Sequence, residues 1–347
     1  MTQGPRSRVS ASGPAVVALG GGHGLHATLR AARHLGDNVT AVVTVADDGG
    51  SSGRLRRELG ALPPGDLRMA LAALSAGTED GKLWSTTVQH RFGGTGALAG
   101  HPVGNLLITG LAEVLGDPVA ALDAVGKLLG VQGRVLPMSR VPLDIEADVV
   151  CLREDPRVST AIRGQHAVAT TTGKVRRVRL IPADPPACAE AVAAVRAADL
   201  VVLGPGSWFS SVIPHVLVPE LLDALVSTGA VRVAVLNLSP EPGETTGFTT
   251  ERYLHVLSQH AAGLRLDAVI VDRQTVLLDK EIAQVSRVAA TLGARLHVAD
   301  VAVPGTSTHD DVLLGKVLAE VLVRGRTPEN AGLAHEVTEG EDARAWR

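Results

Sequence analysis

Residues 39–68, VTAVVTVADDGGSSGRLRRELGALPPGDLR, place a polar loop directly behind an apolar run. The first eight residues are apolar or β-branched, which predicts a buried strand over 39–46. Asp47 and Asp48 follow, and then five small residues lead into a helix predicted at 51–59. In open α/β sheets, ligands bind where a parallel strand ends and a helix begins. This stretch therefore predicts both the fold and the edge of the sheet that carries the site.

The same alternation continues on both sides of this stretch. Further strands rich in Val, Ile and Leu are predicted at 15–19, 199–204, 231–238, 266–272 and 295–301. Helices with apolar residues on one side are predicted at 25–35, 66–76, 104–115, 118–129, 218–227, 250–261 and 281–293. Continuously apolar strands that alternate with helices favour a parallel sheet covered on both faces. We therefore predict a doubly wound, Rossmann-like α/β fold with a mostly parallel sheet.

The chain of 347 residues is predicted to form one domain over residues 14–324. Residues 135–185 interrupt the alternation, because they offer short β segments at 147–152, 166–173 and 174–181 in place of a long helix. We interpret them as a β-rich excursion from the same domain. The two ends, 1–13 and 325–347, are polar and unpatterned, so both are predicted to be disordered tails.

Composition favours small molecules as partners. A net charge of −3 does not give the positive field of a general nucleic-acid binder. No apolar run approaches the roughly 18 residues that a membrane span requires, and the N-terminus lacks the apolar centre of a signal peptide. We therefore expect a cytoplasmic protein with no nucleic-acid partner and no membrane span. Cys151 and Cys188 have no CxxC spacing and are predicted to be buried thiols without metal or disulfide.

The loop after the first predicted strand is rich in glycine, with Gly21, Gly22, His23 and Gly24 directly before a helix. Glycine permits close approach of the backbone, and a helix N-terminus offers N–H groups to a phosphate. The spacing matches neither GxGxxG nor a Walker motif, so a tight strand-to-helix turn is the alternative. His23 and His26 have no third ligand nearby in the sequence, and no metal site is predicted.

Carboxylates follow the second predicted strand. Asp47 and Asp48 occupy the position where nucleotide-binding folds often place an acidic residue on the ribose hydroxyls. Gly49 adds an N–H donor and Ser51 is a candidate helix cap. A plain Asp-Gly turn is the alternative. Asp66 follows Pro-Pro-Gly and is predicted either to be the N-cap of the next helix or to contact a ligand.

Five later residues extend the predicted site. Asn105 begins a helix and offers both a donor and an acceptor to a base or sugar. Gly206 and Ser207 follow the strand predicted at 199–204, and Asn237 follows the next one; such groups can hold phosphate or sugar without a cation. His309 precedes a helix near the C-terminus, and its alternative role is to cap that helix.

Together these motifs resemble those of the gluconeogenesis factor family, the YvcK-like proteins, which are distant relatives of the CofD 2-phospho-L-lactate transferases. The motifs are GGGHGL, ADDGGSSGRLR, LPPGDLR, GNLL, LGPGSWFSSVIPHVLV, LNL with EPGET, and HD, in this order over residues 20–318. The resemblance implies a Rossmann-like fold and a cytoplasmic protein that binds a UDP-sugar such as UDP-N-acetylglucosamine. It also implies a role in cell shape and wall synthesis during gluconeogenic growth.

The resemblance also implies which residues line the ligand cleft: Gly21, Gly22, Asp47, Asp48, Asp66, Asn105, Gly206, Ser207 and Asn237. This sequence departs from the family pattern at three positions. His23, Met69 and Thr308 stand where many relatives have Thr, Asn and Arg.

Two main functions remain as hypotheses. The first is a nucleotide-sugar-binding regulatory protein that needs no cofactor, because polar loops follow four strands but no pair of nucleophile and base is apparent. No catalytic residue is predicted. The second is a CofD-type transferase of a phospho-lactate group, with Mg²⁺ held by Asp47 or Asp48. An NAD-dependent oxidoreductase is a third hypothesis, which the glycine spacing disfavours. The sequence leaves open a homodimer and modification by a Ser/Thr kinase.

Overall fold

The computed structural model describes residues 13–153, 155 and 157–326. The two predicted tails lie outside the described residues, apart from Gly13 at one end and Gly325 and Arg326 at the other. Gly325 is the last residue of helix α13 (Asp311–Gly325), and Arg326 forms an ion pair with Asp199. Ordered structure therefore runs slightly past the predicted boundary at residue 324.

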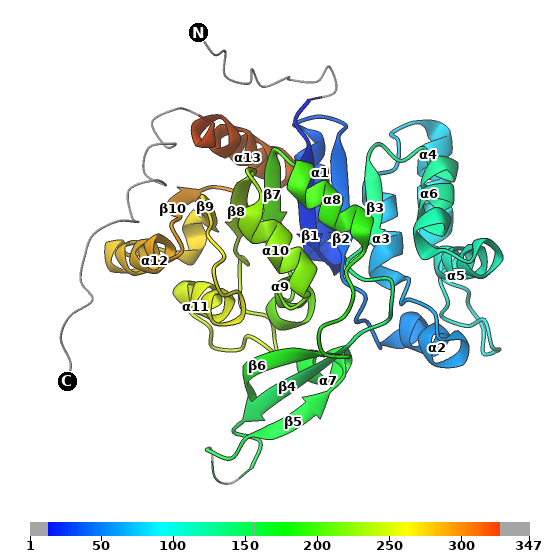
Figure 1. Ribbon diagram of the computed structural model, residues 1–347, viewed down its shortest axis with the longest axis horizontal. Coiled ribbons are helices and arrows are strands. Elements are labelled where there is room, and N and C mark those ends of the chain that lie inside the picture. The colour runs from blue at the N-terminus through cyan, green and yellow to red at the C-terminus, as the bar shows by residue number, and fades with distance from the viewer. Residues whose placement is uncertain (1–12, 154, 156, 327–347) are drawn as a thin grey trace, which may run out of the picture.

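Seven parallel strands form the central sheet, in the order β10-β9-β8-β7-β1-β2-β3 (Figure 1). Their bounds are Val16–Gly20 (β1), Val39–Val43 (β2), Arg134–Pro137 (β3), Leu200–Leu203 (β7), Val231–Val235 (β8), Ala268–Asp272 (β9) and Arg295–Ala299 (β10). The chain winds outward from β1 to β3, returns to place β7 on the other side of β1, and then winds outward to β10. The order therefore reverses between β1 and β7, which is where such folds bind ligands.

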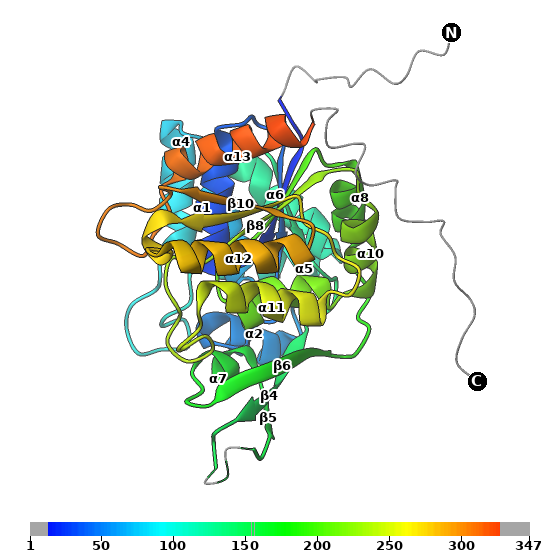
Figure 2. The same ribbon diagram turned by 90° about the vertical axis from the view of Figure 1, so that its left-hand side faces the viewer.

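Helices cover both faces of this sheet. Figures 1 and 2 show α1 (Gly22–Arg33) and α13 on one face and α8 (Ala189–Ala197) and α10 (Pro219–Ser227) on the other. The remaining helices, apart from α7 in the small sheet described below, are α2 (Gly50–Leu59), α3 (Gly65–Ala73), α4 (Glu79–Gln89), α5 (Val103–Leu115), α6 (Pro118–Leu128), α9 (Ile213–Val216), α11 (Thr250–His260), α12 (Asp279–Thr291), π-helical η1 (Trp208–Val212) and 3₁₀-helical η2 (Arg273–Thr275). The predicted doubly wound α/β fold is confirmed.

The core explains why the strands read as continuous apolar runs. Every residue of β1, β7 and β9 is buried, because helices lie on both sides of the sheet. Among the described residues, no single helix is long and apolar enough to span a membrane; Trp208–Val216 and Pro219–Ser227 reach that length only as a pair bent by 73°. The aromatic side chains of Trp208 and Phe209 are fully buried in the core.

A small antiparallel sheet extends beyond the carboxyl edge of the large one (Figure 1). It comprises β4 (Asp144–Val150), β5 (Thr160–Arg163) and β6 (Lys174–Ile181), in the order β5-β4-β6, with the short helix α7 (Gln165–Ala169) between β5 and β6. The predicted β-rich excursion is confirmed. The β segment predicted at 166–173 is wrong, because α7 begins there. Gly164 turns the chain at φ +106°, and the carboxylate of Asp48 accepts a hydrogen bond from His166 N at 2.9 Å.

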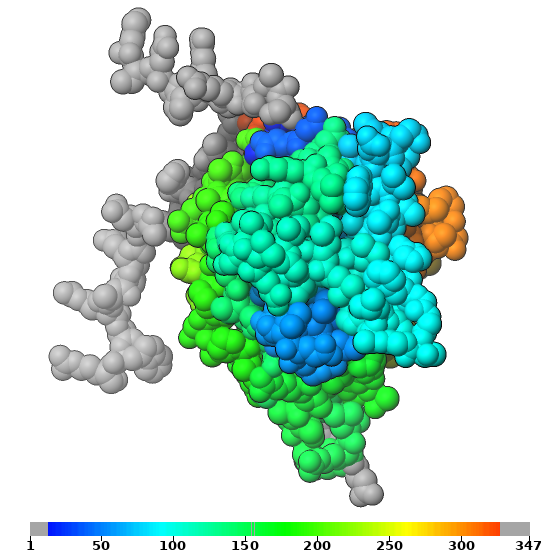
Figure 3. Space-filling model, turned by 90° about the vertical axis from the view of Figure 1, so that its right-hand side faces the viewer, coloured from blue at the N-terminus to red at the C-terminus, as the bar shows by residue number. Residues whose placement is uncertain are grey.

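Helix α2 lies between this small sheet and the rest of the molecule. In Figure 3 its blue surface lies below the teal surface of α5 and α6 and above the green small sheet. Arg56 on α2 donates to the backbone oxygen of Leu143 at 2.8 Å and forms an ion pair with Asp144 at 2.5 Å. Helix α2, which follows the loop after β2, therefore connects the small sheet to the rest of the molecule.

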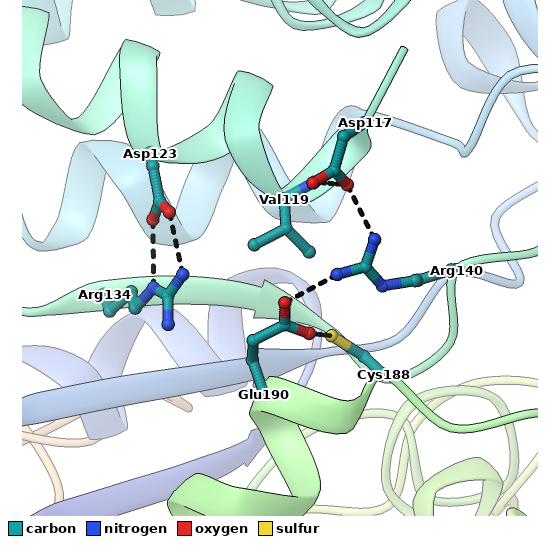
Figure 4. Close-up of polar contacts among 7 residues, drawn as sticks. All are labelled: Asp117, Val119, Asp123, Arg134, Arg140, Cys188 and Glu190. Carbon is teal, nitrogen blue, oxygen red and sulfur yellow. Dashed lines mark hydrogen bonds and ion pairs between the residues drawn. The ribbon is translucent and has the colours of Figure 1, made fainter. Parts of the chain in front are cut away.

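Ion pairs connect α6, β3 and α8 at one side of the fold (Figure 4). Arg134 binds Asp123 through two hydrogen bonds of 3.0 and 2.7 Å. Arg140 bridges Asp117 at 2.8 Å and Glu190 at 2.6 Å. The hydrogen bond from Arg140 is the main reason that the pKa of Glu190 falls to about 2.

The two cysteines differ in environment. Cys188 is buried and its thiol donates to Glu190 at 3.2 Å (Figure 4), and burial raises its pKa. Cys151 is exposed at the end of β4, so the prediction of a buried thiol is wrong there. An apolar neighbourhood in the sequence does not distinguish a residue just after a strand, such as Cys151 after β4, from a core position.

Candidate functional site

Polar loops converge where the strand order reverses. The loops that follow β1, β2, β7 and β8 all open at the carboxyl edge of the sheet. We call the space between these loops the crevice. Within it, the loops after β1, β7 and β8, together with residues 307–309, line a pocket of about 180 Å³, and no residue of the loop after β2 lines that pocket. Five of the predicted site residues line it, namely His23, Gly24, Gly206, Asn237 and His309.

The glycines of the first loop allow two backbones to touch. A Cβ at Gly24 would overlap the carbonyl oxygen of Pro205 and the Cα of Gly206. A Cβ at Gly21 would overlap the carboxyl of Asp66 and the methyl group of Thr44. The glycine-rich turn thus brings the N-terminus of α1 against the loop after β7.

Asn237 holds the loop after β7 in place. Its Oδ1 accepts from Gly206 N at 3.0 Å, and its Nδ2 donates to Gly206 O at 3.0 Å. This pairing uses one acceptor and one donor of the amide. The hydroxyl of Ser207 donates to the carboxylate of Glu241 at 2.6 Å, which is a charge-assisted hydrogen bond. Asn237 therefore shapes the pocket wall that it also lines.

His309 is a neutral imidazole on the far wall of the pocket. Its exposed fraction is 8%, and burial lowers its pKa to about 4. Its Nε2 has no hydrogen-bond partner within the described part of the chain. A buried polar atom without a partner is costly, and a bound molecule or an ordered water can satisfy it. Asp310, the next residue, caps α13 by accepting from Val312 N and Leu313 N, both at 2.9 Å.

Asp66 is a carboxyl at the base of the crevice with a raised pKa. Burial and then the nearby Asp47 raise that pKa to about 7, and a hydrogen bond from Gly22 N opposes the rise. Asp66 keeps some exposed surface, and its carboxyl lies beside Gly21 and Gly22 in the loop that precedes α1. The prediction that it is the N-cap of α3 is wrong. Pro64 occupies the cap position, and Ser52 Oγ accepts from Gly65 N at 3.0 Å instead.

The two aspartates after β2 have different partners. Asp47 Oδ1 accepts from Gly49 N at 2.9 Å, and its other oxygen lies near Gly65. Asp48 Oδ1 accepts from His166 N at 2.9 Å and so binds the small sheet to the loop. Asp47 faces Asp66, whereas Asp48 faces α7.

A buried hydrogen-bond network supports the loop after β2. Arg68 Nε donates to Asn105 Oδ1 at 2.9 Å, Asn105 Nδ2 donates to Ser51 Oγ at 3.0 Å, and Ser51 Oγ lies 2.8 Å from His101 Nδ1. Ser51 is not a helix cap, because α2 begins at Gly50 with Gly49 at the cap position. Asn105 is 1% exposed, so it positions Ser51 and Arg68 from beneath the surface.

Sequence reasoning missed part of the buried polar cluster beside η1. Glu244 is 2% exposed, and burial raises its pKa to about 8. Its Oε1 accepts from Phe209 N at 3.2 Å, and the hydroxyl of Ser210 lies beside the same carboxyl. The hydroxyl of Thr44, just after β2, has no partner within the described residues. The available signal was the EPGET motif at the strand end, from which no residue was chosen.

The arrangement offers hydrogen-bond donors, neutral acceptors and two adjacent carboxyls, Asp47 and Asp66. Across residues 13–153, 155 and 157–326, no group of three or more His, Cys, Asp and Glu side chains is placed to hold a metal ion. The crevice can thus orient a polar ligand by hydrogen bonds.

Comparison with known proteins identifies the family. The family model described as 2-phospho-L-lactate transferase CofD matches residues 16–302. A Mycobacterium tuberculosis protein named "Putative gluconeogenesis factor" is 64% identical over 89% of this chain and 90% of its own length. The "Gluconeogenesis factor" of Bacillus subtilis is 36% identical over 76% of this chain and 80% of its own length.

The comparison with solved structures supports the same family. A crystal structure of a UPF0052 family protein from Bacillus halodurans has a TM-score of 0.78 and 32% identity, covering 89% of this chain and 100% of that one. The chain belongs to the gluconeogenesis factor family and carries a CofD-related domain.

Proposed function

We propose that this protein binds a nucleotide sugar of the UDP class, such as UDP-N-acetylglucosamine, and acts as a cytoplasmic regulator of cell shape and wall synthesis during gluconeogenic growth. The observation that carries the proposal is the pocket between the β1, β7 and β8 loops, with His309 on its wall and the N-terminus of α1 at its edge. Family membership supports the same role.

The chemistry of this edge suits a diphosphate. The N–H groups of the first helical turn have no acceptor within the helix, and the helix dipole favours an anion there. Gly22 N is engaged by Asp66, which leaves the N–H groups of His23 and Gly24 for phosphate oxygens. No cationic side chain lines the pocket, so backbone donors supply the anion contacts.

The size of the crevice suits a sugar as well as a nucleotide. A second hollow, of about 600 Å³, shares the lining residues Asn237, Leu238 and Ser239 with the pocket of about 180 Å³. Phe248 and Tyr253 contribute aromatic surface to the second hollow. Drug-sized ligands occupy pockets of roughly 300–1,000 Å³ that combine apolar walls with a few polar groups.

Calorimetric titration with UDP-N-acetylglucosamine, NAD and GTP tests the proposal. We expect UDP-N-acetylglucosamine to bind and His309→Ala to weaken it about tenfold, the effect of one lost hydrogen bond in a buried site. His255→Ala, at an exposed position on α11, is the matched control and should bind like the wild type. Binding of NAD alone would contradict the proposal.

A CofD-type transferase is the second candidate, because Asp47 and Asp66 lie side by side at the crevice. Mg²⁺ prefers one or two carboxylates together with substrate phosphates, and this pair offers both carboxylates. When bound, Mg²⁺ would neutralise charge on the transferred group. Asp48, the other predicted ligand, is already engaged by His166 N. Incubation with lactyl-diphospho-guanosine, a deazaflavin acceptor and Mg²⁺ tests this candidate: a phosphodiester product would favour it, and no product would exclude this reaction.

A further inference from the structure

A third hollow lies away from the crevice and from the hollow lined by Phe248 and Tyr253. It has a volume of about 660 Å³ and is bounded by α1, α4, the N-terminus of α13 and the segment between α3 and α4. We call it the basic groove, and its lining residues include His26, Arg30, Arg33, His34, Lys82 and Asp311. None of the residues assigned to the crevice lines it.

The charge of the basic groove is positive. Arg30, Arg33 and Lys82 carry three positive charges, and Asp311 is its only acidic lining residue. Asp311 is already paired with Arg30 at 2.8 Å. Glu79, outside the lining, lies 3.3 Å from Lys82, but their side chains are 94% and 66% exposed, and such pairs are weak. The chain as a whole carries −3, so this local charge opposes the average.

Polar donors in the basic groove are unused. The side chains of Ser85, Thr86 and Gln89, all on α4, make no hydrogen bond within the described segments. Arg33, by contrast, is fixed in place, because its Nη1 donates to Ser75 O at 2.9 Å. A guanidinium that lines the same hollow as free hydroxyl and amide groups suits the binding of an anion.

We infer that the basic groove is a second ligand site, for a small molecule that carries one or more phosphate groups. Its volume lies in the range of small-molecule sites. Arginine binds phosphate through two parallel hydrogen bonds, and lysine adds a point charge. Residues on α1 line both sites, since His23 faces the crevice and His26 the basic groove. The inference is independent of what the crevice binds.

Titration calorimetry with pyrophosphate at low ionic strength tests the site. We expect Lys82→Gln to weaken pyrophosphate binding about tenfold, because it removes a charge-assisted contact from an exposed side chain that folding does not require. Asp311→Asn should strengthen binding about threefold, because it removes the one facing negative charge and releases Arg30. Lys316→Gln is the control: it removes the same charge from an exposed position on α13 outside the basic groove and should change nothing.

Lys82→Gln should lower the affinity for pyrophosphate and Asp311→Asn should raise it, and these opposite changes distinguish binding in the basic groove from binding at the crevice. Pyrophosphate that binds equally to wild type, Lys82→Gln and Asp311→Asn is bound elsewhere and overturns the inference, as does the absence of binding to the wild type. A single-stranded DNA oligonucleotide that binds more tightly than pyrophosphate, and loses affinity in Lys82→Gln, would also overturn it in favour of a polymer site. UDP-N-acetylglucosamine binding should be unchanged in Lys82→Gln, so the two proposals fail separately.

Discussion

Asp66 and Glu244 are carboxyls whose protonated form the folded protein favours. Both are desolvated, and each has a second carboxyl nearby, Asp47 for Asp66 and Glu241 for Glu244. They differ in access, because Asp66 faces the crevice and Glu244 is 2% exposed. Protonation of Asp66 should therefore affect ligand binding, whereas protonation of Glu244 should affect stability.

We predict that UDP-N-acetylglucosamine binds up to about tenfold more tightly at pH 6 than at pH 8. The pKa of Asp66 is about 7, so its carboxyl loses a repulsive charge near Gly22 as the pH falls through that value. The diphosphate diester of the ligand keeps its charge over this range. Calorimetry on wild type and Asp66→Asn checks the prediction, since the variant should show a flat profile. An affinity that rises with pH in the wild type would contradict it.

We predict that Glu244→Gln stabilises the protein at high pH. The pKa of Glu244 in the folded protein, about 8, lies above the ordinary glutamate value of 4.5, so its contribution to stability is complete below the ordinary value and is lost as the pH rises through about 8. The free energy of unfolding of the wild type, measured with urea, should therefore fall between pH 5 and pH 9. Glu244→Gln should reduce that loss by about 3 kcal/mol, whereas the exposed control Glu113→Gln should retain it. An identical pH profile for Glu244→Gln and wild type would rule this out.

At the scale of elements, the crevice depends on the contact between the α1 N-terminus and the loop after β7. Gly24 meets Pro205 and Gly206, and Thr28 Oγ1 donates to Gly204 O at 2.9 Å. Asn237 fixes the same loop from β8. Three elements are thus held together by one glycine and two polar side chains.

Gly24→Ala should disrupt this contact. The added methyl group would overlap backbone atoms, which cannot move as a flexible side chain does, and we expect a loss of about 2 kcal/mol in the free energy of unfolding together with weaker ligand binding. Gly110→Ala on α5 is the matched control. Its new Cβ meets nothing within 4 Å, and alanine is the better helix former, so stability should rise by about 0.5–1 kcal/mol. A Gly24→Ala protein as stable as wild type would show that the loops are not in tight contact.

The sequence predicted elements best where burial on both faces imposes an apolar run. The segments at 15–19, 199–204 and 266–272 correspond to β1, β7 and β9, whose residues are all buried. Prediction from the sequence failed where tertiary contacts determine the secondary structure. Helix α4, with two buried residues, has little apolar pattern and was not predicted. Helix α7 contains residues typical of strands, but the Asp48 carboxylate satisfies one of its first N–H groups.

At the scale of the molecule, the sequence predicted which loops meet at the carboxyl edge of the sheet but could not predict the partners of the individual side chains. Strand ends predict which loops meet, because carboxyl ends of parallel strands share an edge. Side-chain partners are non-local and leave no periodic signal. Asp47 and Asp48 are adjacent in the chain, yet one faces Asp66 and the other α7. Their ligand roles stay predictions.

The small sheet is attached to the crevice through few polar contacts. Asp48 accepts from His166 N, Val178 N donates to His260 Nε2 at 3.2 Å, and Arg56 on α2 binds Leu143 O and Asp144. Because the loop after β2 carries both Asp47 and Asp48, movement of the small sheet is coupled to the crevice. The attachment should therefore affect ligand binding without any direct contact.

Substitutions of Asp48 test this coupling. Asp48→Ala removes the acceptor of His166 N, so we expect faster hydrogen exchange in α7 and the neighbouring β5, with little change in the seven-stranded sheet. Asp48→Asn keeps an oxygen in the same place, so its exchange should match the wild type. The two variants also separate tether from ligand contact: if the carboxylate itself binds the ligand, Asp48→Asn loses affinity as Asp48→Ala does, whereas a pure tether leaves Asp48→Asn near wild type. Unchanged exchange at α7 in Asp48→Ala would show that the Asp48 contact does not hold α7 in place.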